Sequence, residues 1–247
     1  EVVIYRIENG SEVEALRETK NGEHTLNYAP EIDFTEATSK LKVVVSDGRE
    51  GKEATGYVKA YVNMDVATLN VGSQPLANNA HEKYPDAFGM VSLNDLKTYS
   101  VDYAIANEVN AKNVDFKFYC FGASGSPRLY SMDNTGKDGE FSGSTGKLSA
   151  IKVKNLTRFA ILSNFDYENA TVTSISSEIL SSSITQSLLD PIAVGNIIAF
   201  RTGGSSAAGG GRIGVMKVIN ITEPKDLVSS NATARVMTVE IKFPKKK

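Results

Sequence analysis

The sequence predicts a mainly β protein of two modules: a β-sandwich at the N-terminus, then an α+β module with a mostly antiparallel sheet. Three observations predict this class. Short β-branched segments between turn residues recur roughly every 8–12 residues near the N-terminus, which is typical of sandwiches. Apolar and polar residues alternate over 114–121, and three β-rich segments close the chain. Charge also divides the chain. Residues 1–65 hold 8 basic and 13 acidic side chains and are therefore acidic, whereas the whole chain has a net charge of only −2, so the remaining residues are slightly basic.

The first module, residues 1–65, is expected to contain five short strands. Asn9-Gly10 and Asp47-Gly48 are hairpin signals, because both residues of each pair tolerate positive φ. β-branched or alternating segments flank these turns. We therefore expect strands at residues 2–7, 13–18, 24–28, 41–45 and 54–62.

A family resemblance refines this expectation. Residues 41–62 read as a β-branched strand, an Asp-Gly turn and a final alternating strand. This segment resembles the last hairpin of bacterial extracellular immunoglobulin-like (PKD-like) domains, and residues 4–10 are similar to their middle strand and turn. The resemblance implies an immunoglobulin-like β-sandwich that is incomplete, because one or two opening strands are missing. Either the module is truncated or a neighbour completes its sheet.

A linker at 66–83 and a second module at 84–247 follow. The linker is rich in Asn, Gly and Pro, with one short strand expected at 67–71. In the second module, the strand at 114–121 places Cys120 on the face of Phe116 and Phe118, so we expect Cys120 to pack as a small apolar residue. Apolar spacing predicts a helix at 176–189. The closing segments predict an antiparallel meander of strands at 194–201, 212–222 and 234–243.

A second resemblance covers residues 84–243. The segments at 194–202 and 211–222 are similar to a paired signature of uncharacterised surface lipoproteins of Bacteroidota, and so are shorter segments at 114–119, 129–131 and 157–159. The resemblance implies a secreted protein at the extracellular or outer-membrane surface, with the periplasm as the other compartment. It implies a lipid anchor on an N-terminal Cys; this chain lacks that Cys, so an anchor requires a removed N-terminus. The group has no known catalytic residues to transfer.

Composition excludes several classes of function. No run of about 18 apolar residues occurs, so no transmembrane span is expected. The near-zero net charge and the short tail Lys245–Lys247 are too weak to predict a nucleic-acid partner. One Cys excludes a disulfide framework and a Cys-rich zinc site, and the two His residues argue against a catalytic triad. His81 is expected to be solvated. No metal and no cofactor are expected.

Two glycine- or acid-rich segments are assigned to turns. Residues 209–214 spell G-x-G-x-x-G, but a β-rich segment follows where a dinucleotide site needs a helix, so we expect a hairpin loop. Residues 133–140 offer several oxygens, but their spacing does not match a calcium loop.

Three aromatic side chains, Tyr119, Phe121 and Tyr130, are the candidate binding residues. They would be exposed if the sheet is covered on one face only; the favoured alternative is a second core against the helix at 176–189. We expect a non-enzymatic cell-surface binding or scaffold protein that engages a glycan or a protein. The alternatives are a glycan-processing enzyme with paired carboxylates in the 122–146 loop, and a purely structural or adhesive subunit with an open sheet edge or a donated strand.

Overall fold

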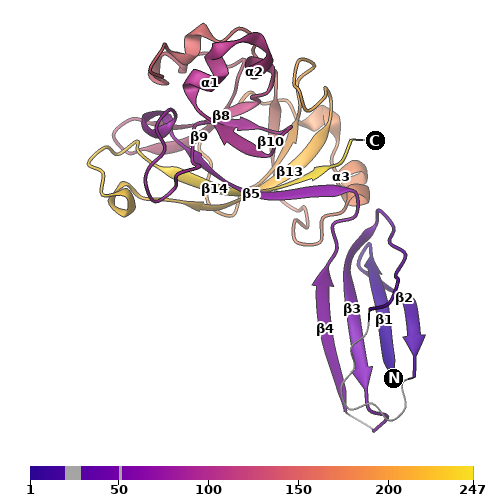
Figure 1. Ribbon diagram of the computed structural model, residues 1–247. Coiled ribbons are helices and arrows are strands. Elements are labelled where there is room, and N and C mark those ends of the chain that lie inside the picture. The colour runs from indigo at the N-terminus through magenta and orange to yellow at the C-terminus, as the bar shows by residue number, and fades with distance from the viewer. Residues whose placement is uncertain (20–28, 50–51, 247) are drawn as a thin grey trace. The chain divides into compact units, whose positions relative to one another are not determined.

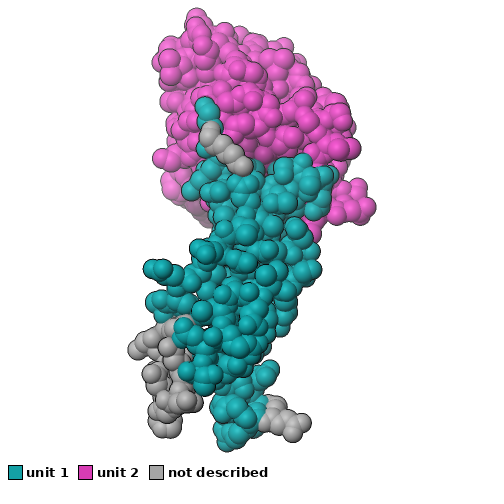
Figure 2. Space-filling model, turned by 90° about the vertical axis from the view of Figure 1, so that its right-hand side faces the viewer, with its two compact units in different colours: residues 1–65, 168–178, 244–247 teal, residues 66–167, 179–243 magenta. Residues whose placement is uncertain are grey.

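The computed structural model describes residues 1–19, 29–49 and 52–246. It divides into two compact units, shown in different colours in Figure 2: unit 1 comprises 1–65, 168–178 and 244–247, and unit 2 comprises 66–167 and 179–243. The described residues form three antiparallel sheets. The prediction of a mainly β protein is therefore confirmed.

Sheet A makes up most of unit 1 and has four strands in the order β2-β1-β3-β4 (Figure 1). Asn9 and Gly10 both adopt positive φ, of 49° and 82°, so the expected tight turn joins the first two strands. The strand bounds are Val2–Glu8 for β1, Ser11–Glu18 for β2, Thr38–Ser46 for β3 and Glu53–Lys59 for β4. The short helix α3, Val172–Glu178, also belongs to this unit.

Unit 1 contains one sheet among its described residues, whereas the sequence predicted two packed sheets. The strand expected at 24–28 lies outside the described residues. Val2 and Ile4 are buried on one face of sheet A, where the segment 30–34 lies against them and against β3 around a cavity of about 430 Å³. The described sheet is therefore covered on part of one face by an irregular segment.

Unit 2 holds two five-stranded sheets. Sheet B has the order β10-β12-β13-β14-β5, so the predicted closing meander is confirmed as β12, β13 and β14. Its strands are Arg158–Leu162 (β10), Ile197–Arg201 (β12), Ile213–Ile221 (β13), Val236–Pro244 (β14) and Met64–Gly72 (β5). Sheet C has the order β11-β9-β8-β6-β7. Its strands are Leu188–Leu189 (β11), Ser126–Ser131 (β9), Phe116–Phe121 (β8), Met90–Ser92 (β6) and Lys97–Tyr99 (β7).

Sheets B and C share one core, so the two-layer packing that the sequence predicted for the first module occurs in unit 2. Phe116 of β8 packs edge-on against Phe159 of β10, with ring centres 5.8 Å apart. Cys120 is fully buried in the same cluster, as predicted. Alternation along β8 directs Phe116, Phe118 and Cys120 into this core and sends the intervening side chains to the other face of sheet C.

The other face of sheet C packs against a set of short helices and turns, which we call the helical cover. It consists of α1 (Val101–Ala106), α2 (Glu108–Lys112) and the 3₁₀ turns η2 (Asp138–Glu140) and η3 (Leu148–Ala150). The side chains of Ser100 and Asn107 cap α1 and α2. The remaining 3₁₀ turns are η1 (Gln74–Leu76), η4 (Ser181–Ser183) and η5 (Pro224–Leu227).

Three element predictions are wrong. The segment 122–146, expected to be a loop, contains β9 and η2. The helix expected at 176–189 is divided among the end of α3, η4 and β11. The stretch 66–83, expected to be a linker, begins inside β5, whose Leu69 and Val71 are buried in the core of unit 2. Apolar spacing alone does not distinguish a helix from a turn followed by a short buried strand. Residues that favour turns also flank short strands, so composition alone does not identify a linker or a loop.

Candidate functional site

The three predicted binding residues come from the two central strands of sheet C. The register pairs Tyr119 with Arg128 and Lys117 with Tyr130 across β8 and β9. Tyr119 and Tyr130 therefore lie on the face of sheet C that meets the helical cover. Their rings pack edge to face with centres 5.6 Å apart.

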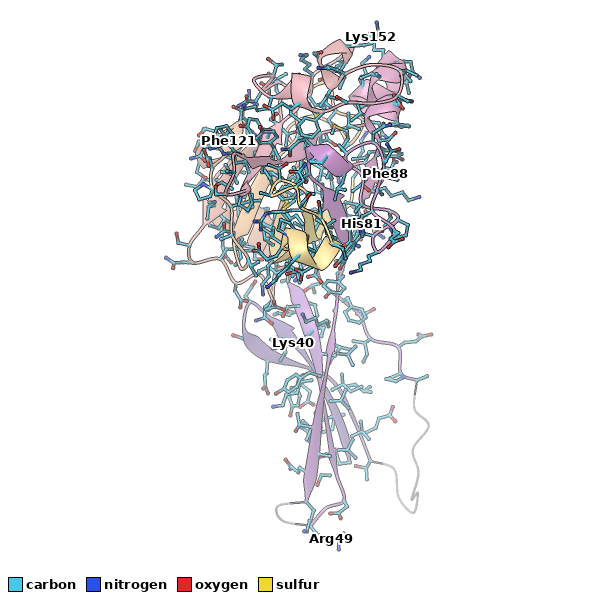
Figure 3. The ribbon with its side chains drawn as sticks, turned by 90° about the vertical axis from the view of Figure 1, so that its left-hand side faces the viewer. Lys40, Arg49, His81, Phe88, Phe121 and Lys152 are labelled. Atoms are coloured by element: carbon cyan, nitrogen blue, oxygen red, sulfur yellow. The ribbon has the colours of Figure 1, made fainter. Side chains whose placement is uncertain are left out.

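Burial separates the three residues. Tyr119 is 2% exposed and Tyr130 is 4% exposed, both within the cluster that includes Phe141 and Leu148. Phe121, at the end of β8, is 41% exposed and lies at the surface of unit 2 (Figure 3). The favoured alternative of a second core thus describes two of the three residues, although the helical cover forms that core instead of residues 176–189.

Phe121 lies against two cationic side chains that the sequence analysis did not single out. The guanidinium carbon of Arg128 is 4.1 Å from the ring centre, and Lys137 Nζ is 5.0 Å from it. A carboxylate holds each cation: Asp190 Oδ2 is 2.8 Å from Arg128, and Glu140 Oε1 is 2.9 Å from Lys137. Cations near an aromatic ring are attracted to its electron-rich face. We call these five side chains the Phe121 face.

Tyr119 connects the Phe121 face to the buried cluster. Its hydroxyl donates a hydrogen bond to Glu140 Oε2 at 2.5 Å. Burial, followed by this hydrogen bond to a carboxylate, raises the pKa of Tyr119 to about 12. Hydrogen bonds from Lys137 and Tyr119 hold the pKa of Glu140 below its ordinary value. Tyr119 therefore acts as a neutral donor that fixes Glu140.

A fully buried lysine, Lys117, lies on β8 two residues before Tyr119 and on the same face of sheet C. Lys117 Nζ is 2.8 Å from Asp138 Oδ1 and donates to the backbone carbonyls of Ser131 and Asn134 at 3.3 and 3.0 Å. Lys154 donates to the other oxygen of Asp138 at 3.3 Å. Burial lowers the pKa of Lys117, and the charge of Asp138 opposes that shift. This cluster ties β8 and β9 to the helical cover.

The carboxylates of the segment 122–146, which contains β9 and η2, are Asp133, Asp138 and Glu140, and each lies within ion-pair distance of a cation. Arg158 binds Asp133 through two hydrogen bonds of 2.8 Å each. Burial raises the pKa of Asp133, but the hydrogen bonds from Arg158 and Ser131 outweigh it and leave the pKa below its ordinary value. A glycosidase acid needs a raised pKa. In this arrangement the loop carboxylates serve as ion-pair partners.

Other reactive side chains are also engaged. Burial raises the pKa of the Cys120 thiol to about 12, which keeps the thiol protonated. His81 accepts from the Lys83 N–H through Nδ1, so its Nε2 donates to the Leu227 carbonyl 3.0 Å away (Figure 3). His24 lies outside the described residues. Within the described ranges, no three His, Cys, Asp or Glu side chains come together as a metal site.

The G-x-G-x-x-G segment has a packing role. Gly209 and Gly211 have φ values of 92° and 75°, which suit the loop that precedes β13. Gly214 packs under the Phe200 and Phe243 rings, and a Cβ there would overlap both. The hairpin-loop prediction is confirmed, because residues 202–212 join the antiparallel strands β12 and β13, and β13 begins at Ile213.

Comparisons with known proteins give one structural likeness. No protein-family model matches the chain, and no curated protein matches it. A crystal structure of a DUF4466 family protein from Parabacteroides merdae is similar, with 13% sequence identity and a TM-score of 0.47 over 83% of this chain. The chain spans 62% of that structure's length. No helix among the described residues has the length and apolar character needed to cross a membrane.

Proposed function

We propose that the protein is a non-enzymatic binding or scaffold protein at a bacterial cell surface, and that the Phe121 face of unit 2 binds its partner. The surface location follows from the sequence resemblance of residues 84–243 to Bacteroidota lipoproteins, which also implies secretion and a lipid anchor. The immunoglobulin-like assignment of unit 1 rests on the resemblance within residues 2–62. Unit 1 then serves as a spacer.

One observation carries the choice of binding over catalysis. The three loop carboxylates, Asp133, Asp138 and Glu140, all lie within ion-pair distance of a lysine or arginine. An acid–base pair of a glycosidase needs one carboxyl that keeps its proton near neutral pH and one that activates water or attacks the sugar. Side chains that already neutralise one another are better suited to holding a surface in one shape.

The Phe121 face favours a protein partner over a glycan. Exposed aromatic and arginine side chains are enriched at the centres of protein interfaces. A sugar needs an open ring face for stacking, whereas two cations approach the Phe121 ring at 4.1 and 5.0 Å. A partner with apolar and acidic side chains would contact both the ring and the flanking cations.

The test compares the wild-type chain with its Phe121→Ala and Arg128→Ala variants for binding to arrays of extracellular proteins and of glycans. Val109→Ala is the matched control, because Val109 is 77% exposed on α2. We expect a bound protein whose affinity falls at least tenfold in both face variants and is unchanged in the control. Tyr119→Ala and Tyr130→Ala are unsuitable controls, because both rings are buried. The proposal would be refuted if Phe121→Ala left the affinity for the bound protein unchanged. It would also be refuted if the chain hydrolysed a glycan and Glu140→Gln abolished that hydrolysis.

A structural or adhesive subunit is the second candidate function. The observation that favours it is an open edge of sheet A, which lies outside the Phe121 face and is developed below.

A further inference from the structure

Strand β4 is an exposed edge strand of sheet A. All seven of its residues, Glu53–Lys59, are exposed, including Tyr57 at 60% and Val58 at 59%. Figure 1 shows β4 at the outer side of the sheet, and among the described residues β3 is its one neighbour in the sheet order. An edge strand presents unpaired N–H and C=O groups that can pair with another strand.

The other edge strand, β2, carries features that oppose such pairing. A register irregularity interrupts its ladder with β1 between Ile4 and Tyr5. β2 also holds three Glu side chains and one Arg, so the β2 strands of two copies would repel each other. Bulges and like charges are common protections of natural edges. β4 has neither, since its seven pairs with β3 run in unbroken register and it carries one Glu and one Lys.

The backbone groups of β4 that point away from the sheet can be identified. Ala60 N–H donates to the Ser39 carbonyl at 3.0 Å, and the Lys52 carbonyl accepts from Asp47 N–H at 3.4 Å. In an antiparallel ladder the residues that bond to one neighbour alternate with those that face away. The even-numbered residues of β4 therefore bond to β3. The outward N–H and C=O groups belong to Glu53, Thr55, Tyr57 and Lys59.

This edge is complementary to itself. An antiparallel pairing of two β4 strands about a two-fold axis at Gly56 places Glu53 opposite Lys59 of the second copy, and Thr55 opposite Tyr57. Each of these pairs joins residues whose backbone groups point outward, so the hydrogen bonds can form. Opposite charges and an aromatic side chain next to a β-branched one are favourable cross-strand pairs. We infer that the protein dimerises by pairing β4 with β4 of a second copy in this register.

The paired sheet also gains a continuous apolar strip. Ala54 lies opposite Val58 of the second copy, on the face that carries Val43 and Val45 of β3. Lys59 already lies 2.8 Å from Glu168 Oε2 in its own unit, and its side chain is half exposed, so its ammonium can bridge two carboxylates. A strand pair buries little area, so we expect a weak dimer with a dissociation constant of about 0.01–1 mM.

The first test is a cross-link at the two-fold axis. Gly56 is opposite its own copy at a non-hydrogen-bonded position, where Cα atoms are about 4.5 Å apart, within reach of a disulfide. No atom lies within 4 Å of a Cβ built at Gly56, so Gly56→Cys should fold. Thr55→Cys is the matched control, because Thr55 meets its own copy only diagonally, at about 7–8 Å. Mild oxidation of the full chain should cross-link Gly56→Cys at least tenfold faster than Thr55→Cys.

The second test exchanges the charges and is read by sedimentation of the full chain. Glu53→Lys and Lys59→Glu each turn two attractive pairs into repulsive ones, so each should raise the dimer dissociation constant at least tenfold. An equimolar mixture of the two variants restores both opposite-charge pairs and should dimerise like wild type. Glu31→Lys, at an exposed site outside the strand, is the matched control.

Three results would overturn the inference. The first is a wild-type chain that is monomeric by sedimentation at about 1 mM, the upper end of the dissociation constants expected for a strand pair. The second is equal cross-linking rates for Gly56→Cys and Thr55→Cys. The third is a mixture of the two charge variants that dimerises no better than either variant alone. Because none of these readouts involves Phe121, failure here is distinguishable from failure of the proposed function.

Discussion

The buried carboxyl of Asp115 gives a pH prediction whose sign and size come from its surroundings. Asp115 is fully buried in the segment before β8, where its carboxylate accepts from Leu93 N–H at 2.8 Å and from Asn155 Nδ2 at 3.4 Å. Burial raises its pKa from an ordinary 3.8 to about 6, and hydrogen bonds from Ser206 and Leu93 offset only part of the rise. The folded protein thus holds this proton to a higher pH than the unfolded chain.

The sign follows from proton binding in the two states. Between about pH 4 and 6 the unfolded chain releases the proton while the folded protein keeps it, so this group makes the free energy of unfolding fall as the pH rises. A difference of about 2 pKa units corresponds to about 3 kcal/mol. The side-chain amide of the Asp115→Asn variant cannot titrate. Because the unfolded carboxyl is already more than half ionised at pH 4, wild type should lose about 2 kcal/mol relative to Asp115→Asn between pH 4 and pH 7.

Urea unfolding at pH 4, 5, 6 and 7, monitored by circular dichroism, measures this difference. The unfolding transition of unit 2 is compared, because Asp115 belongs to that unit. Asp133→Asn is a control of opposite sign, because Arg158 holds the pKa of Asp133 below its ordinary value and its contribution is lost as the pH falls. A stability difference between wild type and Asp115→Asn that stays constant within about 0.5 kcal/mol from pH 4 to 7 would refute the reasoning, since the linkage requires a change several times larger.

Three further predictions concern unit 2. Lys117→Met should lower the free energy of unfolding by about 3 kcal/mol in urea, because Asp138 loses its buried partner; adding Asp138→Leu should recover most of that loss, and a purely additive double variant would contradict this. Gly214→Ala should destabilise by about 2 kcal/mol or more in the same assay, because its Cβ would overlap the Phe200 ring; an unchanged midpoint would contradict this. Cys120 should react with a thiol reagent at pH 8 only after urea is added, because its thiol is buried, and fast native labelling would contradict this.

Strand positions were predictable where a local pattern determines them. The Asn9-Gly10 turn and the alternation along 114–121 identified β1, β2 and β8, and placed Cys120 in a core. The same alternation placed Tyr119 and Phe121 on one face, but their burial differs because residues 138–151 cover only the first. Contacts between segments this far apart in the chain leave no periodic signal.

The helix predicted at 176–189 shows how a correct apolar pattern can indicate the wrong element. Ile179, Ile184 and Leu189 are all buried, at 4%, 0% and 2% exposure, as the spacing suggested. Ser181–Ser183 form a 3₁₀ turn between them, and β-strand pairing with β9 holds Leu189. Serine competes for backbone hydrogen bonds and lowers helix propensity, so the three apolar residues reach the core from separate elements.

Charge pairing explains why the carboxylates of residues 122–146 suggested a glycosidase in the sequence, whereas in the fold they form ion pairs that hold neighbouring segments together. Sequence shows Asp133 and Glu140 in an acidic loop, but not that Arg158 and Lys137 lie beside them. Charge also bears on the edge strand β4, where Lys59 lies 2.8 Å from Glu168 Oε2 and its side chain is half exposed. On β4 the opposite charges of Glu53 and Lys59 lie at the two ends of the strand. Antiparallel pairing of two copies brings these opposite ends together, which is why that edge favours a second copy of the chain over an arbitrary strand.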